Sequence, residues 1–187
     1  MTSVIADTER HLFLVGTMSL NSFNEVHLIQ YSEEKNDVWC VGLYPHKHEI
    51  WSISPCPSEK DLFFTVYNTG KEYKTSLWKM PPLEETEKEN SSAKLECLLT
   101  IEGHSDPLHN VLWNTKLGSL DRILTVDNSS VKEWNIDSIS KKSESISTYS
   151  ILGNRVTCAK WDPHHPNLVA VASRSKIQQI DLRTKKY

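Results

Sequence analysis

The sequence has no excess of positive charge. Its 21 Lys and Arg residues stand against 24 Asp and Glu residues, which gives a net charge of −3 at pH 7 and an isoelectric point near 6.2. A chain with this balance offers no broad electropositive field to attract phosphate backbones or anionic lipid. We therefore expect no nucleic-acid partner.

Long apolar segments and a secretory leader are also missing. No stretch approaches the roughly 20 apolar residues that are needed to cross a bilayer. The first ten residues contain Asp7 and Glu9 and no apolar block, so they do not resemble a signal peptide. We expect a cytoplasmic protein that is not inserted into a membrane.

Cysteine pairs and metal-ligand clusters are absent as well. The four cysteines are scattered without C-x-x-C spacing, in or beside apolar runs, which favours reduced core thiols over disulfides or metal ligands. They are Cys40, Cys56, Cys97 and Cys158. His46 with His48, and His164 with His165, form histidine pairs, but no Cys or carboxylate spacing supplies the other ligands that zinc needs. The sequence predicts no metal and no cofactor.

No nucleophile elbow or glycine-rich oxyanion loop is present. His104, Asp127 and a nearby serine could be drawn as a catalytic triad. We favour a structural network in which His104, an aspartate in a turn and a tryptophan share hydrogen bonds. We therefore expect neither enzymatic activity nor a small-molecule substrate.

The apolar residues lie in short runs rich in Val, Ile, Leu, Trp and Thr, and polar or glycine-containing clusters separate them. This pattern is typical of strands and turns, and no long helical periodicity accompanies it. The clearest runs are 12–17, 25–31, 38–44, 49–55, 61–67, 74–80, 95–101, 108–114, 121–126, 130–136, 146–152, 155–162, 167–173 and 176–182. The sequence predicts an all-β chain.

Three strand types recur in a fixed order, which indicates an internal repeat. In the third type, Tyr31, Trp78, Trp134 and Ile180 occupy one position and are spaced by 47, 56 and 46 residues. A propeller blade of four short strands needs roughly 40–45 residues. We interpret residues 1–187 as one incomplete WD-repeat β-propeller of three to four four-stranded blades, with units ending near 31, 80, 136 and 182.

One repeat carries nearly the whole WD signature. Gly103 and His104 precede the Trp134-Asn135 pair by thirty residues, the spacing at which WD repeats place Gly-His and Trp-Asp, with Asn135 standing where Asp is usual. We expect the residues at such positions to anchor blades by packing and hydrogen bonding. These structural anchors are Trp78, His104, Trp113, Trp134, Trp161 and Asp181.

Two polar segments interrupt the strands. Residues 83–94 are almost free of apolar side chains and cannot offset their ordering entropy by burial, so we expect a mobile loop. Residues 137–145 resemble them and predict a second, shorter loop.

Four segments, in this order, resemble the amino-terminal half of the EARP-interacting protein family: FLVGTMSL at 13–20, EIWSIS at 49–54, LWKMP at 77–81 and WDPHH at 161–165. The resemblance runs from about residue 12 to residue 183. It implies a WD-repeat scaffold that binds tethering complexes of endosomes and the Golgi, lies at those membranes peripherally, and supports endosomal recycling and the sorting of dense-core vesicle cargo.

The resemblance also implies a closed ring about twice this long, with a strand ahead of the position of Leu12. Only residues 1–11 precede that position here, so we expect a fragment or a truncated form with open sheet edges. Residues that begin the innermost strands of a propeller often face its narrow end, where scaffolds bind peptides. The candidate partner contacts are Glu49, Trp51, Asn110 and Arg155. Two alternatives stay open: these side chains only seal blade against blade, or the protein is an adaptor of a chromatin or ubiquitin-ligase complex.

Overall fold

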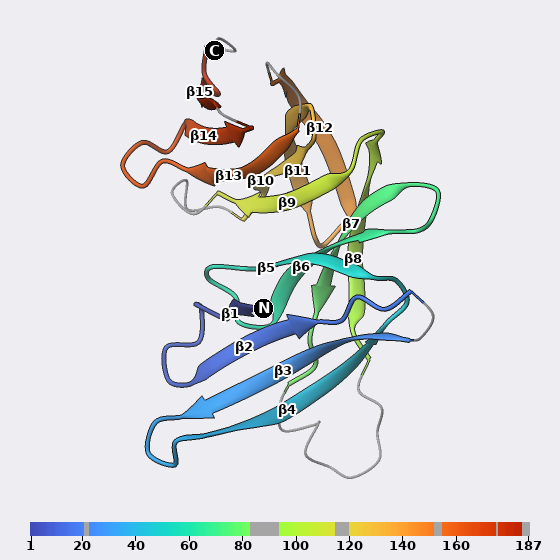
Figure 1. Cartoon of the computed structure of the whole chain (residues 1–187), viewed down its shortest axis with the longest axis vertical. Coiled ribbons are helices and arrows are strands. Elements are labelled where there is room, and N and C mark those ends of the chain that lie inside the picture. The colour runs from blue at the N-terminus through green and yellow to red at the C-terminus, as the bar shows by residue number, and fades with distance from the viewer. Residues whose placement is uncertain (21–22, 83–93, 115–119, 152–154, 175, 185–187) are drawn as a thin grey trace.

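The chain is all-β, as predicted. The computed structural model describes residues 1–20, 23–82, 94–114, 120–151, 155–174 and 176–184. These residues form fifteen strands and no helix (Figure 1). Within this part of the chain there is accordingly no helix long and apolar enough to cross a membrane.

Consecutive strands pair antiparallel into four separate sheets. The first sheet contains β1 (Thr2–Ser3), β2 (His11–Gly16), β3 (Asn24–Ser32) and β4 (Asp37–His46). The second contains β5 (Ile50–Pro55), β6 (Leu62–Asn68), β7 (Tyr73–Lys79) and β8 (Glu96–His104). The third contains β9 (Leu108–Trp113), β10 (Arg122–Asp127), β11 (Ser130–Asp137) and β12 (Lys142–Ser150). The fourth contains β13 (Val156–Trp161), β14 (Leu168–Ser173) and β15 (Lys176–Asp181).

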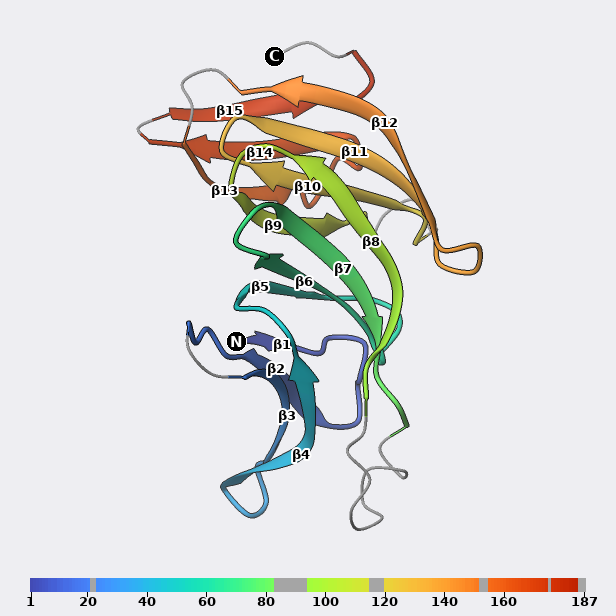
Figure 2. The same cartoon turned by 90° about the vertical axis from the view of Figure 1, so that its right-hand side faces the viewer.

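The sheets stack face to face along the molecule, from β1–β4 at one extreme to β13–β15 at the other (Figures 1 and 2). The innermost strands β5, β9 and β13 lie next to one another. The stack does not close into a ring. The predicted partial propeller of three to four blades is therefore confirmed.

Three apolar clusters fill the spaces between neighbouring sheets. Successive side chains of a strand point to opposite faces, so a strand in a middle sheet feeds two clusters. Phe63 packs against the first sheet and Phe64 toward the third, while Ile123 and Leu124 divide in the same way one sheet further on. This two-sided burial explains why these strands are continuously apolar in the sequence instead of alternating.

Each of three inner strands has a one-residue irregularity near its start. Ile50 pairs with Tyr67 and Ser52 with Val66, so Trp51 is the extra residue. The same shift makes His109 the extra residue in β9 and Thr157 in β13. Such a bulge turns the local strand and redirects its side chain. Trp51, His109 and Thr157 are therefore structurally equivalent.

The structure corrects three expectations. Residues 1–11 include a short strand, β1, in which Thr2 pairs with Leu14, so the position ahead of Leu12 is occupied. Residues 137–145 are a tight hairpin and not a loop, because Asp137 pairs with Lys142 across a turn that Asp137 itself caps through Ser140. Of the cysteines, only Cys56 is buried; the other three are exposed, although all four are free thiols.

The predicted repeat units end at the third strand of each sheet, because the fourth strand of a sheet begins the next unit along the chain. The long polar insertion is different: residues 83–93 lie outside the described residues, and only Lys94 of that segment is described.

Candidate functional site: the leading surface and the clasps between blades

The candidate contact residues lie at one end of the sheets, where the inner strands begin. We call this the leading end, and the opposite end, where the inner strands finish, the trailing end. Glu49 and Trp51 flank the start of β5, Asn110 lies early in β9, and Arg155 immediately precedes β13. The structure therefore places these four residues at the same end of three neighbouring sheets.

Trp51 is a partly exposed aromatic side chain at the leading end. Its exposed fraction is 42%. Its ring meets Tyr73 edge to face, with 5.7 Å between the centroids, and its Nε1 donates to Glu49 Oε2 at 3.4 Å. Because the neighbouring β7 residue supports it, the indole is held in place while much of its face stays accessible to a partner.

Around this pair, further ring and charge contacts fix the surface. The His48 ring stacks on Tyr67, with a centroid distance of 5.2 Å and an interplanar angle of 2°. Lys74 bonds Glu102 at 2.6 Å and Glu72 at 3.0 Å. These contacts limit side-chain motion at the leading end of the second sheet, which lowers the entropy that a partner must remove on binding.

In the third sheet the corresponding residue is His109, not Asn110. His109 Nε2 lies 2.7 Å from Asn128 Oδ1. Asn110 turns inward: its Oδ1 accepts from the backbone N–H of Val111 at 2.9 Å and from Ser52 Oγ at 3.5 Å. The structure thus gives Asn110 contacts that join one blade to the next. Asn110 corresponds to Ser52 of β5, because both strands carry the same bulge one residue earlier.

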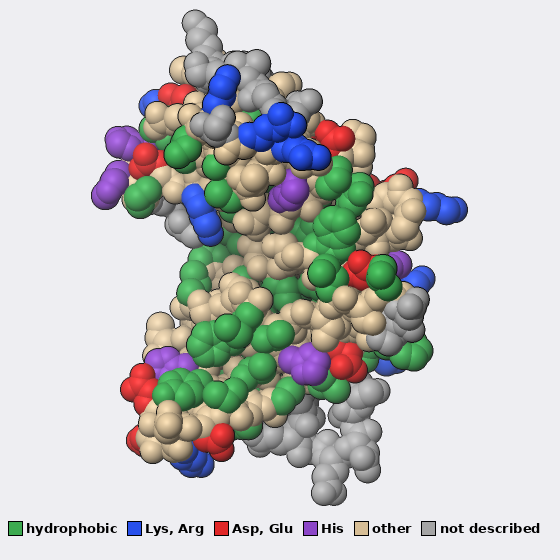
Figure 3. All heavy atoms as spheres, in the orientation of Figure 1, with side chains coloured by type: hydrophobic (Ala, Val, Ile, Leu, Met, Phe, Trp, Pro, Cys, Tyr) green, Lys and Arg blue, Asp and Glu red, His purple; other side chains and the backbone are tan. Residues whose placement is uncertain are grey.

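At the fourth sheet the leading end is cationic. Arg155 is exposed, with φ of 59°, and Arg174, with φ of 47°, follows the end of β14. Arg155 precedes Val156 and Arg174 follows Ser173. Because Val156 and Ser173 pair with each other, the two arginines lie at the same end of the sheet. Lys and Arg side chains gather over the β13–β15 extreme of the molecule (Figure 3). We call Glu49, Trp51, Tyr73, His109 and Arg155 the leading surface.

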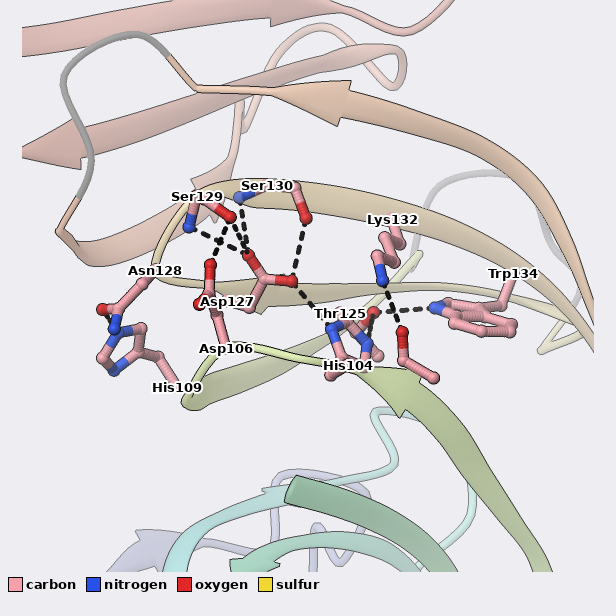
Figure 4. A network of polar contacts seen from close by, with 11 residues as sticks. His104, Asp106, His109, Thr125, Asp127, Asn128, Ser129, Ser130, Lys132 and Trp134 are labelled. Carbon is pink, nitrogen blue, oxygen red and sulfur yellow. Dashed lines mark hydrogen bonds and ion pairs between the residues drawn. The ribbon is translucent and has the colours of Figure 1, made fainter. Parts of the chain in front are cut away.

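A buried hydrogen-bond chain clasps the second sheet to the third (Figure 4). His104, the last residue of β8, donates from Nδ1 to Asp127 Oδ2 at 2.9 Å. Its Nε2 accepts from Thr125 Oγ1 at 2.9 Å, and Thr125 Oγ1 in turn accepts from Trp134 Nε1 at 2.7 Å. The network brings together the histidine, the turn aspartate and the tryptophan that the sequence analysis linked.

Asp127 is the most heavily bonded member of this clasp. Burial alone would raise the pKa of its carboxyl, but hydrogen bonds from His104, Ser129 and Ser130 lower that pKa to about 2. The backbone N–H groups of Ser129 and Ser130 donate to Oδ1 at 2.9 and 2.6 Å. Asp127 therefore stays ionised while it is almost fully enclosed.

A second clasp joins the first sheet to the second, and the sequence analysis missed it. His46, at the end of β4, accepts at Nε2 from Thr65 Oγ1 at 3.1 Å, and Trp78 Nε1 donates to the same hydroxyl at 2.8 Å. His46 Nδ1 donates to the backbone carbonyl of His48 at 2.7 Å. The available signal was the alignment of His46 with His104, each four residues ahead of an inner strand.

The remaining anchors have different surroundings. Trp113 is buried and donates from Nε1 to the Ser54 carbonyl at 3.0 Å across the blade boundary. Trp161 is half-buried and its Nε1 has no hydrogen-bond partner within the described part of the chain. The Asp181 carboxylate accepts hydrogen bonds from Arg183 in an exposed turn, which lowers the pKa of the carboxyl to about 2. The structure does not bring Asp181 into a clasp.

The hydrogen bonds of these groups join neighbouring sheets. Across the residues that the structure describes, no three or more His, Cys, Asp or Glu side chains gather where they could hold a metal ion. The His104–Asp127 pair presents no exposed nucleophile, because its other nitrogen is occupied by Thr125 inside the protein.

Comparison with known proteins places the chain in a family. The profile of the EIPR1 beta-propeller family matches residues 2–187. WD repeat-containing protein DWA2 of Arabidopsis thaliana is 35% identical over 187 residues, 100% of this chain and 52% of that protein. The EARP-interacting protein homolog of Danio rerio is 30% identical over 200 residues, 98% of this chain and 51% of that protein.

The human protein named EARP and GARP complex-interacting protein 1 is 28% identical over 201 residues, 98% of this chain and 51% of that protein. The chain therefore spans about half the length of these relatives. Since the family profile covers all but the first residue, the chain belongs to the EIPR1 beta-propeller family.

Proposed function

We propose that the chain is a non-enzymatic scaffold whose leading surface binds a subunit of a membrane-tethering complex. The observation that carries the proposal is the exposed, braced Trp51–Tyr73 pair on the leading surface. Relatives whose names include interaction with the EARP and GARP complexes support the choice of partner. The protein would act in the cytoplasm and at endosomes or the trans-Golgi as a peripheral component.

The composition of the leading surface suits a protein partner. Trp, Tyr and Arg are the residues that most often dominate binding energy at interfaces. Here Trp51 and Tyr73 lie beside Glu49, and Arg155 lies two blades away, so the surface changes from apolar and acidic to cationic along its length. A partner segment with an apolar anchor at one end and a carboxylate at the other would match it.

The cellular role that we propose is endosomal recycling and the sorting of dense-core vesicle cargo. A stack of rigid sheets can hold a tether subunit on one face and leave other edges for a second protein. An adaptor role in a chromatin or ubiquitin-ligase complex is the competing proposal, because the same architecture serves both.

The test is affinity capture from cells that express the tagged chain, followed by quantification of EARP and GARP subunits. We expect Trp51→Ala to reduce their recovery about tenfold or more, since loss of a central aromatic anchor typically costs 2 kcal/mol or more. The matched control is Ile139→Ala, an apolar side chain that is 93% exposed in the β11–β12 turn at the trailing end. It should leave recovery unchanged.

Three results would count against the proposal: no tether subunit recovered with the unaltered chain, equal loss with both variants, or unchanged recovery with Trp51→Ala. Recovery of histones or cullin adaptors instead, lost with Trp51→Ala, would favour the competing role. Because Trp51 is half exposed and makes one long hydrogen bond, the substitution should not disturb folding.

A further inference from the structure

The leading end of the fourth sheet carries three cations that form no ion pair or side-chain hydrogen bond with other described residues. Arg155 immediately precedes β13, and Arg174 and Lys176 belong to the turn that joins β14 to β15. All three side chains are exposed. Residues 152–154 and 175 are Leu, Gly, Asn and Ser, so the sequence places no carboxylate directly beside these cations.

The strand pairing holds the three cations close together. Val156 pairs with Ser173, and Ser173 pairs with Lys176. Residues that pair in antiparallel strands have Cα atoms about 4.5–5.5 Å apart, so all three cations begin from neighbouring points of the backbone. Lys and Arg side chains gather over this extreme of the molecule (Figure 3). Side chains of this length can therefore reach one ligand group together.

The same positions of the second sheet have a different charge. Glu49 occupies the position of Arg155, because each residue immediately precedes the inner strand of its sheet. Lys74 occupies the position of Lys176, but two carboxylates bind its ammonium group, and the nearer one is that of Glu102 at 2.6 Å. The second sheet thus neutralises its one cation, whereas the fourth sheet adds two arginines and no acid among the described residues at this end.

Arg174 adopts a backbone conformation that favours a different residue. Its φ is 47°, in the left-handed region, within a two-residue turn. Asn and Gly fit such a turn with less strain than Arg does. The corresponding residues of the second and third sheets are Asn68 and Asn128. The fourth sheet therefore has Arg at a position where Arg costs stability, which points to a role for its side chain.

Three neighbouring cations suit a ligand group that carries two negative charges. A phosphate monoester has a charge of about −1.5 to −2 at pH 7 and three acceptor oxygens, which the planar fork of an arginine can bind in pairs. A carboxylate has a single charge and would neutralise only one of the three cations. A membrane surface is a poorer match, because the cations occupy one end of one sheet and the whole chain has a net charge of −3.

We propose that Arg155, Arg174 and Lys176 bind a phosphorylated serine or threonine of a protein partner. Arg155 already belongs to the leading surface, so the inference rests on the proposed function and specifies the chemistry of the partner. The partner segment would place its apolar anchor on Trp51 and its phosphate group, in place of a carboxylate, on the fourth sheet.

The test uses N-acetyl-O-phospho-L-serinamide as probe and amide chemical shifts of the ¹⁵N-labelled full chain as readout. We expect saturable shifts at the amides of Val156, Ser173 and Lys176. The probe N-acetyl-L-glutamic acid amide should bind about tenfold more weakly, because its carboxylate has less charge and fewer acceptors. N-acetyl-L-serinamide, which has no charged group, should produce no saturable shifts.

Three variants make the result specific. Arg174→Asn should weaken binding of the phosphoserine probe about tenfold, since it removes charge-assisted hydrogen bonds. The same variant should melt at the same temperature or higher, because Asn adopts the left-handed conformation with less strain. Arg155→Glu, which introduces the residue of the second sheet, should abolish binding. Lys160→Gln is the matched control: it removes an exposed cation of β13 away from the leading end and should leave the affinity unchanged.

The proposal is overturned by equal affinity for the phosphoserine and glutamate probes, by equal weakening in Arg174→Asn and Lys160→Gln, or by the absence of saturable shifts. Vesicles of phosphatidylcholine with a phosphatidylinositol phosphate test the other source of phosphate groups. If they bind the chain through Arg174 while the phosphoserine probe does not bind, the ligand is a membrane and the proposal is wrong.

Failure of this site can be told apart from failure of the proposed function. Trp51→Ala should leave the affinity for the phosphoserine probe unchanged. If the probe binds but no EARP or GARP subunit is recovered, the tether assignment fails and the phosphate site stands with another partner. If phosphatase treatment of the cell lysate leaves recovery of the subunits unchanged, the proposed function stands and this inference is overturned.

Discussion

The two clasps occupy the same place in successive blade junctions but differ in one group. At both junctions a histidine from the preceding outer strand, a threonine hydroxyl and a tryptophan N–H form a hydrogen-bonded chain. Between the second and third sheets the histidine Nδ1 meets the Asp127 carboxylate, whereas between the first and second sheets it meets the His48 carbonyl. The register places Tyr67 where Asp127 would be.

The group common to both clasps is therefore the threonine hydroxyl, which bonds the histidine and the tryptophan, whereas the Asp127 carboxylate occurs in only one of them. A backbone carbonyl from the connecting segment can replace the carboxylate as acceptor, so the histidine keeps its orientation at both junctions. The carboxylate adds local order instead: its oxygens gather the turn residues Ser129 and Ser130 around one ionised group. At the third junction Val171 and Ile180 occupy the threonine and tryptophan positions, so neither side chain can take part in such a chain, and the two sheets are joined by apolar packing and by a hydrogen bond from the Tyr149 hydroxyl to the Leu182 carbonyl at 3.0 Å.

The largest effect should come from Asp127→Ala. The substitution leaves His104 Nδ1, two backbone N–H groups and the Ser130 hydroxyl without their acceptor, so we expect a loss of about 3 kcal/mol in the free energy of unfolding. Urea denaturation followed by tryptophan fluorescence measures it. Tyr67→Phe, at the corresponding position of the other junction, removes only a hydroxyl bonded to Ser76 and should cost about 1 kcal/mol. Equal losses would show that the carboxylate adds nothing to the clasp.

A smaller and more nearly equal pair of effects should follow from removing the two threonine hydroxyls. Thr125→Val and Thr65→Val keep the side-chain shape but leave a tryptophan N–H and a histidine nitrogen unpaired, so each should cost about 2 kcal/mol. The same denaturation assay compares them. Val171→Thr is the reverse control: it introduces a buried hydroxyl where neither partner exists, and it should also destabilise the chain. A loss confined to Thr125→Val would contradict a common threonine-centred clasp.

The sequence was sufficient to predict the strands, because apolar runs bounded by turn residues survive in any antiparallel stack. The sequence was not sufficient for two short elements that lack an apolar run. β1 contains only two residues, and the hairpin after Asp137 is polar because it projects from the sheet and not because it lacks order. The hairpin was assigned as a loop from composition alone.

Site prediction from sequence depended on register. His104 and Trp134 were found because Gly-His and Trp lie at fixed spacing, whereas His46 follows a proline and lacks the glycine. Asn110 was chosen from its place at the start of an inner strand, but the register makes His109 the residue equivalent to Trp51 and Asn110 the one equivalent to Ser52.

The smallest effect should be a difference in the pH at which each of the two clasps loses stability. Burial lowers the pKa of His46 below its ordinary 6.5, so between these two values the unfolded chain binds a proton that the folded chain does not. Stability contributed by His46 is therefore present above pH 6.5 and decreases as the pH falls below it. The carboxyl of Asp127 is depressed from 3.8 to about 2, so its contribution is present above pH 3.8 and is lost only as the pH falls through that lower window.

Amide hydrogen exchange between pH 7.5 and about 2, corrected for its intrinsic pH dependence, can follow each junction separately. We expect Thr65 and Trp78 to lose protection below pH 6.5, while the loss at Thr125 and Trp134 that depends on Asp127 begins only below pH 3.8. His46→Gln provides the control, because it cannot take up a proton and should remove the upper transition without moving the lower one. If the upper transition persists in that variant, another histidine causes it, and protonation of His46 is not what weakens the clasp between the first and second sheets.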